Sequence, residues 1–296
     1  HTFKNGLHFG VTASVADDKT EVTKWTYNTK IPSYGATGWW DKSAYKEGMV
    51  LGDIWGLQFD RFLTEDDFNA DGSLKAGLPD QTKVFPAGYQ FAPGDVLYKD
   101  LDNNGEIVKQ TNTNDKGDLS VIGNALPRLQ FGLNLDAAWK GFDISMFFQG
   151  VAKRKLWAAG NQVLPGFTTG EPFYKGAEDY WTPENTDAFY PRPMDYKQSA
   201  SGNYSVNDRY LLNMAYLRLK TFTVGYSLPK VWLSKFKVQG LRVYFTGENL
   251  FTIDGVKPAI DPEIGIRTAS GKSDQRNFGR SYPYQKTVSF GIQLSL

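Results

Sequence analysis

The chain has 296 residues, with 33 Lys and Arg residues against 32 Asp and Glu residues. This balance excludes the strongly basic surface that nucleic acids select, so we expect no nucleic-acid partner. The absence of Cys excludes disulfides and thiolate metal sites. No run of roughly 18 or more apolar residues is present, so the sequence predicts no membrane helix.

The first segment has the alternation of a β-strand. Apolar residues from Leu7 to Val15 take every second position, with small or polar residues between them. Asp17 to Lys19 form a turn signal, and an extended pattern resumes from Glu21 to Asn28. This predicts a hairpin with a short connection at 17–20. The chain begins with neither Met nor a leader, and we expect it to be a piece of a longer protein.

A long polar connection is expected over residues 29–128. Within it, the segment around Trp55 indicates a short strand. Thr64 is followed three residues later by Asp67, and this spacing predicts the start of a helix capped by Thr64. The remainder is rich in Gly, Asp and Asn, which is typical of loops.

The segment from Asp100 to Glu106 resembles the first half of a calcium-binding loop, with oxygen-bearing side chains at alternate positions and Gly105 at the sixth. The twelfth position requires a bidentate Glu, and it holds Thr111 instead. An Asx-rich turn explains the same residues without a metal, and we favour that interpretation.

A second hairpin is predicted by two alternating segments on either side of Lys140-Gly141, which form the tight turn. The apolar face of the first strand holds Phe131, Leu133, Leu135, Ala137 and Trp139. The apolar face of the second strand holds Phe142, Ile144, Met146 and Phe148.

Three further strands are predicted between Asn213 and the C-terminus. In the first, alternation from Tyr216 to Ser227 predicts one face with Tyr216, Arg218, Lys220, Phe222, Val224 and Tyr226. The second has Leu241, Val243 and Phe245 opposite Arg242, Tyr244, Thr246 and Glu248. In the last, one face is wholly apolar: Val288, Phe290, Ile292, Leu294 and Leu296.

Periodicity alone leaves a transmembrane barrel and a soluble β-sandwich open, because a single strand carries a weak signal. The long connections at 29–128, 152–213 and 253–285 favour the barrel, in which loops on one side are long and turns on the other are short. Short connections at 17–20, 140–141 and 229–239 would then share one side. The last strand would run toward that side, which in bacterial barrels is the periplasm.

Several motifs resemble those of the SusC-like TonB-dependent transporters of Bacteroidetes. They occur in the family's order along nearly the whole chain. They comprise Gly48-Met-Val-Leu-Gly-Asp-Ile-Trp-Gly56, Pro93-Gly-Asp-Val-Leu-Tyr-Lys-Asp100 followed by Asn104-Gly105, Val121-Ile-Gly-Asn124 with Pro127, Tyr216 to Pro229, Leu241 to Phe251, Asp261-Pro-Glu-Ile-Gly265 and Tyr282-Pro283.

This resemblance implies an all-β fold in which residues 1–296 are the C-terminal portion of an antiparallel transmembrane β-barrel of about 22 strands with long extracellular loops. The plug domain and the upstream strands would belong to another part of the same transporter, on a separate polypeptide. An outer-membrane barrel of this family usually ends in Phe, and the chain departs from that pattern at Leu296.

The resemblance also implies a function and partners. The expected function is TonB-dependent import of nutrient oligomers across the bacterial outer membrane, with oligosaccharides the commoner cargo of the family and oligopeptides the rarer one. Expected partners are a SusD-like lipoprotein lid, TonB acting through the missing N-terminal part, outer-membrane lipid, and a second transporter–lipoprotein pair. A soluble or surface β-rich glycan-binding module without transport is the alternative.

Catalysis is not expected. The sequence holds no HExxH, GxSxG, phosphate-binding Gly loop or CxxC motif. Its two histidines are His1 and His8, and His8 lies on the polar face of its predicted strand. Carboxylates are numerous, but nothing in the sequence marks two of them as a glycosidase pair. No cofactor or metal is expected.

Aromatic residues in the long loops are the candidates for substrate contact, because a flat ring can stack on a sugar or on a peptide side chain. The candidates are Trp39, Trp40, Trp157, Tyr174, Trp181 and Tyr190. The alternative is that these rings pack the loops together or against the lid. A second group of aromatic residues is expected to face lipid: Phe222, Tyr226, Tyr244 and Phe290.

Overall fold

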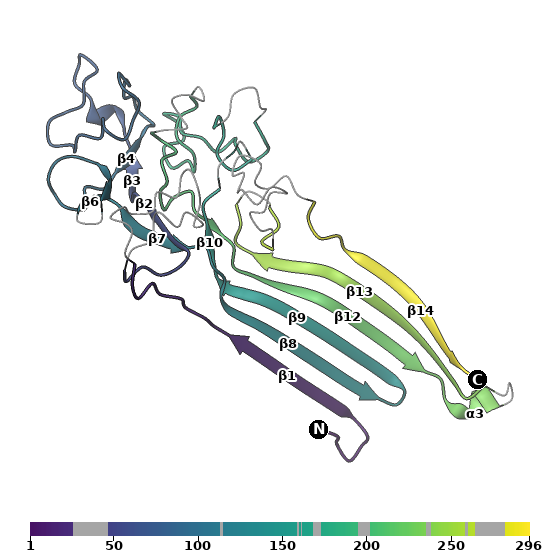
Figure 1. Cartoon of the computed structure of the whole chain (residues 1–296). Helices are drawn as coiled ribbons and strands as arrows, with labels where there is room; N and C mark the ends of the chain where they lie inside the picture. Colours follow the sequence, from purple (N-terminus) through teal and green to yellow (C-terminus); the bar gives the residue numbers. More distant parts are fainter. Residues whose placement is uncertain are drawn as a thin grey trace.

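The computed structural model describes residues 1–25, 47–112, 115–158, 160, 162–167, 173–194, 202–234, 238–257, 260–263 and 282–296. Figure 1 shows one large, curved antiparallel sheet, with the long connections gathered beyond one end of its strands. Both chain termini lie toward the opposite end. The expected all-β fold is therefore confirmed.

The large sheet has six strands in the order β1-β8-β9-β12-β13-β14, and every neighbouring pair is antiparallel. This order follows the chain, so the sheet is a meander. Its strands are β1 (His8–Ala16), β8 (Arg128–Trp139), β9 (Phe142–Lys153), β12 (Tyr216–Ser227), β13 (Gly240–Asp254) and β14 (Thr287–Ser295). The predicted strands around Lys140-Gly141 and the three C-terminal strands are confirmed.

The two faces of this sheet differ in chemistry. On one face, apolar side chains from neighbouring strands meet, as Phe245 and Phe290 do with ring centroids 5.2 Å apart. Phe290 is 84% exposed and Ile292 is 74% exposed. The other face carries polar pairs, including Thr223 with Thr246 at 3.2 Å. Large exposed apolar surface of this kind needs a nonaqueous environment or a partner.

A β-bulge in the middle of β12 overturns the expected face assignment. Leu219 pairs with Phe251 and Thr221 pairs with Glu248, so the register shifts at Lys220. A matching shift occurs against β9. Because an extra residue reverses the alternation beyond it, Arg218 lies on the polar face and Phe222 on the apolar face. The expectation that these two residues share one face is wrong.

Tyr244 also differs from expectation. It shares the polar face with Arg242, whose guanidinium lies 5.0 Å from its ring centroid. Its ring covers Gly291 of β14, where an added Cβ would lie 2.2 Å from Tyr244 Cζ. Glycine is therefore required at 291 for the ring to lie flat on the sheet. Tyr244 does not face lipid.

The expected first hairpin is wrong as well. β1 pairs along its whole length with β8. Glu21 makes only an isolated bridge to Val50, and residues 26–28 lie outside the described residues. The connection at 17–20 is therefore the start of a long loop. Where β1 leaves the sheet and β8 enters it, Arg128 and Asp17 form an ion pair.

Short strand pairs occur in the long connections. They are β2 (Asp53–Gly56) with β7 (Ser120–Asn124), β3 (Phe59–Phe62) with β4 (Val96–Tyr98), β5 (Lys109–Asn112) with β6 (Asp115–Gly117), and β10 (Lys155–Leu156) with β11 (Leu212–Asn213). The predicted strand at Trp55 is β2. The predicted helix start at Thr64 is a single 3₁₀ turn, η3 (Glu65–Asp67), closed by a capping box between Thr64 and Asp67. α3 (Lys230–Leu233) lies between β12 and β13.

The loops have hydrophobic cores of their own. One core gathers residues such as Ile54, Leu156 and Tyr210 around the root of the loops. A second core gathers Leu57, Val96, Tyr98 and others around β3 and β4. The described parts of the connections are thus packed around cores and are not open coil.

Among the described residues, no helix has the length and apolar character that crossing a membrane would require.

Candidate functional site

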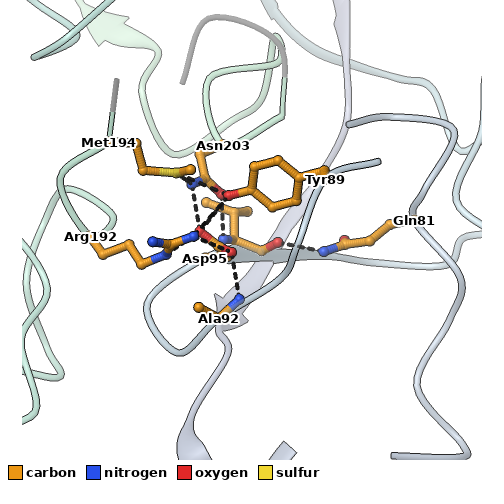
Figure 2. Close-up of polar contacts among 8 residues, drawn as sticks. Gln81, Tyr89, Ala92, Asp95, Arg192, Met194 and Asn203 are labelled. Carbon is orange, nitrogen blue, oxygen red and sulfur yellow. Dashed lines mark hydrogen bonds and ion pairs between the residues drawn. The ribbon is translucent and has the colours of Figure 1, made fainter. Parts of the chain in front are cut away.

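A buried carboxylate joins three loop segments (Figure 2). Asp95 is fully buried at the start of β4. It accepts hydrogen bonds from the Tyr89 hydroxyl at 2.9 Å, the Ala92 backbone N–H at 2.9 Å, Arg192 Nε at 2.8 Å and Asn203 Nδ2 at 2.9 Å. An ionised group at this depth requires such partners, because burying an unpaired charge is costly.

Amide side chains continue this junction along β4. Gln81 Nε2 donates to the Val96 carbonyl at 2.8 Å, and its Oε1 accepts from the Tyr98 N–H at 3.2 Å. Asn203 Oδ1 accepts from the Val96 N–H at 2.8 Å. The two amides therefore satisfy backbone groups that β3 does not pair, and they hold distant loop segments against β4.

The junction is structural rather than reactive. Burial, and then the charge of Asp95, raise the pKa of Tyr89 well above its ordinary value, so this phenol stays neutral and donates its proton. No His or Cys is present among the junction residues to act as nucleophile or base. Its role is to fix the loop geometry around the pocket described next.

A pocket of about 560 Å³ opens in the connection between β9 and β12. Five aromatic residues line it: Phe173, Tyr174, Tyr180, Tyr190 and Tyr204. Its volume lies within the range of about 300–1,000 Å³ that small-molecule sites occupy. This pocket is the candidate binding site.

Two of the six predicted contact residues, Tyr174 and Tyr190, meet in this pocket. Tyr190 is held in place because its hydroxyl donates to the Val163 carbonyl at 2.8 Å. Burial, and then the charge of Asp179, raise the pKa of Tyr190 to about 12, so it is a neutral phenol at physiological pH. Its ring lines the pocket, but Tyr190 is only 5% exposed and also packs in the first loop core.

The other predicted residues lie elsewhere. Trp157 is 2% exposed in the first loop core, and Trp181 is 7% exposed in the second. Their burial favours the alternative in which these rings pack the loops together. Trp39 and Trp40 lie outside the described residues.

Sequence reasoning missed Phe173, Tyr180 and Tyr204, although they line the same pocket. A local signal was present, since aromatic residues and Pro are dense between 165 and 204. That signal does not reveal which rings meet, because Tyr204 lies far along the chain from Phe173 and the fold brings them together.

A second cluster fixes the β13–β14 connection to the sheet wall. Arg218 is buried on the polar face of β12, and it binds Asp261 through Nη2 at 2.8 Å and Thr252 through Nε at 2.7 Å. Lys220 binds Glu263 at 2.8 Å. Burial opposes ionisation of Asp261, but the Glu263 N–H and Arg218 outweigh it, so its pKa is lowered. The Asp261-Pro-Glu motif thus attaches the β13–β14 connection to β12 through two ion pairs.

Three carboxylates, Asp100, Asp102 and Asp118, lie close together, with oxygen atoms all within 4.8 Å of one another. Such an oxygen set is the type that could hold Ca²⁺. The sequence pointed to the first two and missed the buried Asp118. Backbone N–H groups already engage them, as Gly105 N–H does with Asp100 at 2.7 Å and Val108 N–H does with Asp118 at 2.7 Å. The Asn104 N–H donates to Asp102 at 3.1 Å and the Glu106 N–H to Asn104 at 2.7 Å, which is the two-residue spacing of the Asx-turn interpretation.

Comparisons with known proteins show which proteins the chain resembles. No family model matches the chain. A segment of 258 residues is 29% identical to TonB-dependent receptor P3 of Formosa agariphila, covering 84% of this chain and 22% of that protein. A segment of 200 residues is 32% identical to TonB-dependent receptor P26 of the same organism, covering 66% of this chain and 19% of that protein.

The chain is similar in sequence to the SusC-like TonB-dependent receptors. It is also 25% identical over 242 residues to TonB-dependent receptor SusC of Bacteroides thetaiotaomicron, covering 78% of this chain and 22% of SusC. The expected resemblance is confirmed, and with it a place in the bacterial outer membrane. The chain spans about a fifth of the length of these SusC-like relatives.

Solved structures show the same fold. The structure of the RagAB peptide transporter matches with a TM-score of 0.63 at 20% identity, covering 99% of this chain and 27% of that chain. The RagAB peptide importer in its closed-closed state matches with a TM-score of 0.63, covering 28% of that chain. The SusC-like chain thus has the fold of about a quarter of such a transporter.

Proposed function

We propose that residues 1–296 are the C-terminal part of a barrel that imports nutrient oligomers across the outer membrane by a TonB-dependent mechanism. The observation that carries this proposal is the two-faced sheet. Exposed apolar residues follow each other across the strands on one face, as Phe9 of β1 and Phe290 of β14 do, while polar residues occupy the other. This is the pattern of a barrel wall between lipid and lumen.

The sheet requires further strands. Among the named strands of the described residues, β1 pairs only with β8, and β14 only with β13; beyond these pairs, β1 has an isolated bridge at its start, between His8 and Thr2. Each therefore presents an edge of unpaired backbone groups, which a bilayer does not tolerate. The upstream part of the same transporter would supply the missing strands, the plug and the contact with TonB. This chain would then contribute its strands to the barrel wall and its connections to the extracellular loops.

A SusD-like lipoprotein lid is the partner that suits the loop side of this wall. The pocket lies in the loops beyond the strands, where a lid could close over a bound ligand, and the solved neighbours include a RagAB peptide importer in an 'open-open' and in a 'closed-closed' state. A pair of such transporter–lipoprotein units is the assembly we propose. Catalysis forms no part of the proposal, since the curated relatives are named as receptors.

Extraction and mass spectrometry test the proposal. Membranes are washed with carbonate and then solubilised in detergent, and the purified particle is weighed by native mass spectrometry before and after denaturation. We expect the chain in the detergent fraction, together with a polypeptide that supplies the remaining strands and a lipoprotein. A chain found alone in the aqueous fraction would instead support the glycan-binding module without transport.

A further inference from the structure

A second, smaller pocket lies beside the short strand pair β10–β11, and β10 is found where the connections meet the large sheet (Figure 1). Its volume is about 130 Å³. Two connections close it. Arg209 and Asn213 line it from the β9–β12 connection, and Gly255 and Lys257 line it from the β13–β14 connection. We call this cavity the root pocket.

An aromatic wall is shared by the root pocket and the larger pocket. Phe189 lines the root pocket, and the next residue, Tyr190, lines the larger one. Tyr210 of the root pocket packs on Tyr204 of the larger pocket, with ring centroids 5.3 Å apart. The three tyrosines belong to the first loop core. A wall of this kind is ordered before a ligand arrives, which lowers the entropic cost of binding.

Arg209 brings a fixed positive charge to the root pocket. Its Nε donates to the Phe189 carbonyl at 2.9 Å, and its Nη2 donates to the Ala188 carbonyl at 2.6 Å. Its guanidinium carbon lies 4.3 Å from the ring centroid of Phe59 and 4.9 Å from that of Phe62. Within the described part of the chain, Nη1 has no acceptor and no carboxylate pairs with this arginine. Arg209 is therefore held in place while its charge is not neutralised.

Lys257 and Asn213 add two further donors to the lining. Lys257 is exposed, and it forms no ion pair with any other described residue. The Asn213 amide lies close to Gly255, where an added Cβ would lie 3.1 Å from Nδ2. Of the described residues that line the root pocket, none is Asp or Glu. The lining thus offers two positive charges and an amide, with no negative charge among them.

This charge pattern and volume indicate the class of ligand. Two cations without a counter-charge repel each other, and a doubly charged anion between them is attracted by both. Arg and Lys are the side chains that bind phosphate groups in proteins. The volume suits a group of a few heavy atoms and not an oligomer, because sites for whole small molecules span about 300–1,000 Å³.

We propose that the root pocket binds a doubly charged oxyanion, phosphate or sulfate, between Arg209 and Lys257, with the Asn213 amide as a neutral donor. The anion is either free or an ester group of a larger ligand. This site goes beyond the import function and does not depend on it. A ligand that carries such a group is distinguished here from its neutral counterpart by charge.

Calorimetric titration of the detergent-purified particle at neutral pH tests the proposal and separates the two sources. The probes are inorganic phosphate, glucose 6-phosphate and glucose. We expect phosphate to bind and glucose not to bind. Competition between glucose 6-phosphate and phosphate would assign the site to ester groups as well, and binding of phosphate alone would assign it to the free ion. Acetate that binds as tightly as phosphate would overturn the assignment of a doubly charged ligand.

Substitution of Lys257 tests the site without removing a packed side chain. Lys257→Gln should weaken phosphate binding about tenfold, as expected for loss of one charge-assisted hydrogen bond, and Lys257→Arg should retain it. Lys75→Gln is the matched control, because Lys75 is also exposed and lies outside the root pocket. Equal losses from Lys257→Gln and Lys75→Gln, or no phosphate binding to the unaltered particle, would overturn the proposal. Failure of the import proposal is a separate result, since it would appear as a chain that extracts without detergent whatever it binds.

Discussion

Arg192 donates from Nε to the buried carboxylate of Asp95 at 2.8 Å and thereby joins two loop segments that lie 97 residues apart. Asp95 has no exposed side-chain surface, whereas 27% of the Arg192 side chain is exposed. The pair thus joins a fully buried carboxylate to a partly exposed guanidinium. Because the pocket residue Pro191 is adjacent to Arg192, this contact also positions one wall of the pocket.

Removing the cation should destabilise the loops. Arg192→Met leaves the Asp95 carboxylate buried without its charge partner, and breaking such a pair costs about 3–5 kcal/mol. We expect a clear drop in the thermal unfolding temperature of the detergent-purified particle. Lys83→Met is the control, because the Lys83 pair with Glu106 is exposed and should contribute about 0–1 kcal/mol. Equal effects of the two substitutions would contradict the structural role of Asp95.

Gly94 should tolerate no side chain. Its φ of +90° is strained for other residues, and an added Cβ would lie 2.5 Å from the Trp181 ring. Gly72 has a φ of +82° but open space around it. Gly94→Ala should therefore lower the unfolding temperature more than Gly72→Ala, because only Gly94→Ala adds a clash to the backbone strain. Equal shifts would show that the ring contact is unimportant.

The bulge in β12 predicts which positions accept a charge. Phe222 lies on the apolar face, which would face lipid in the proposed barrel, so Phe222→Lys should cost about 2–4 kcal/mol at the bilayer midplane. Thr221 lies on the polar face, so Thr221→Lys should cost far less. Urea unfolding of the vesicle-reconstituted particle, followed by heat-dependent gel mobility, measures both. A larger loss from Thr221→Lys would mean that the bulge does not reverse the faces.

The capping box at η3 predicts a pH dependence. The Arg61 hydrogen bonds lower the pKa of Asp67 to about 2, from an ordinary 3.8. A carboxyl whose folded pKa is lowered stabilises the fold above its ordinary value and loses that contribution as the pH falls through about 2. The unfolding temperature of the unaltered particle should exceed that of Asp67→Asn at pH 6. The difference should shrink between pH 4 and pH 2, and a constant difference would rule out this linkage.

Strong local patterns predicted much of the sheet. The alternation in β8, β9, β13 and β14 was sufficient to identify these strands and their apolar faces, because one face of each is uniformly apolar. The face assignment of β12 failed because its bulge depends on pairing with both neighbours. The partner of β1 could not be found locally either, since β8 begins at Arg128, and the turn signal at Asp17 suggested a nearer strand.

The candidate site was harder to predict. Tyr174 and Tyr190 were identified from residue type and loop position alone, and that criterion does not separate a ring at a pocket from a ring in a core. Trp157 and Trp181 satisfied it equally well but do not line the pocket, whereas Tyr190 lines the pocket although it is equally buried. The difference arises from long-range packing, such as that of Tyr204 and Tyr210 against Tyr190.

The strands of the wall follow one another in chain order, and each long connection leaves and re-enters the sheet between adjacent strands. An insertion or replacement within one of these connections therefore shifts no strand register elsewhere. Since described parts of the connections also fold around hydrophobic cores of their own, the loops can change without a change in the sheet. In the proposed transporter, a new cargo would therefore require new loops on unchanged strands.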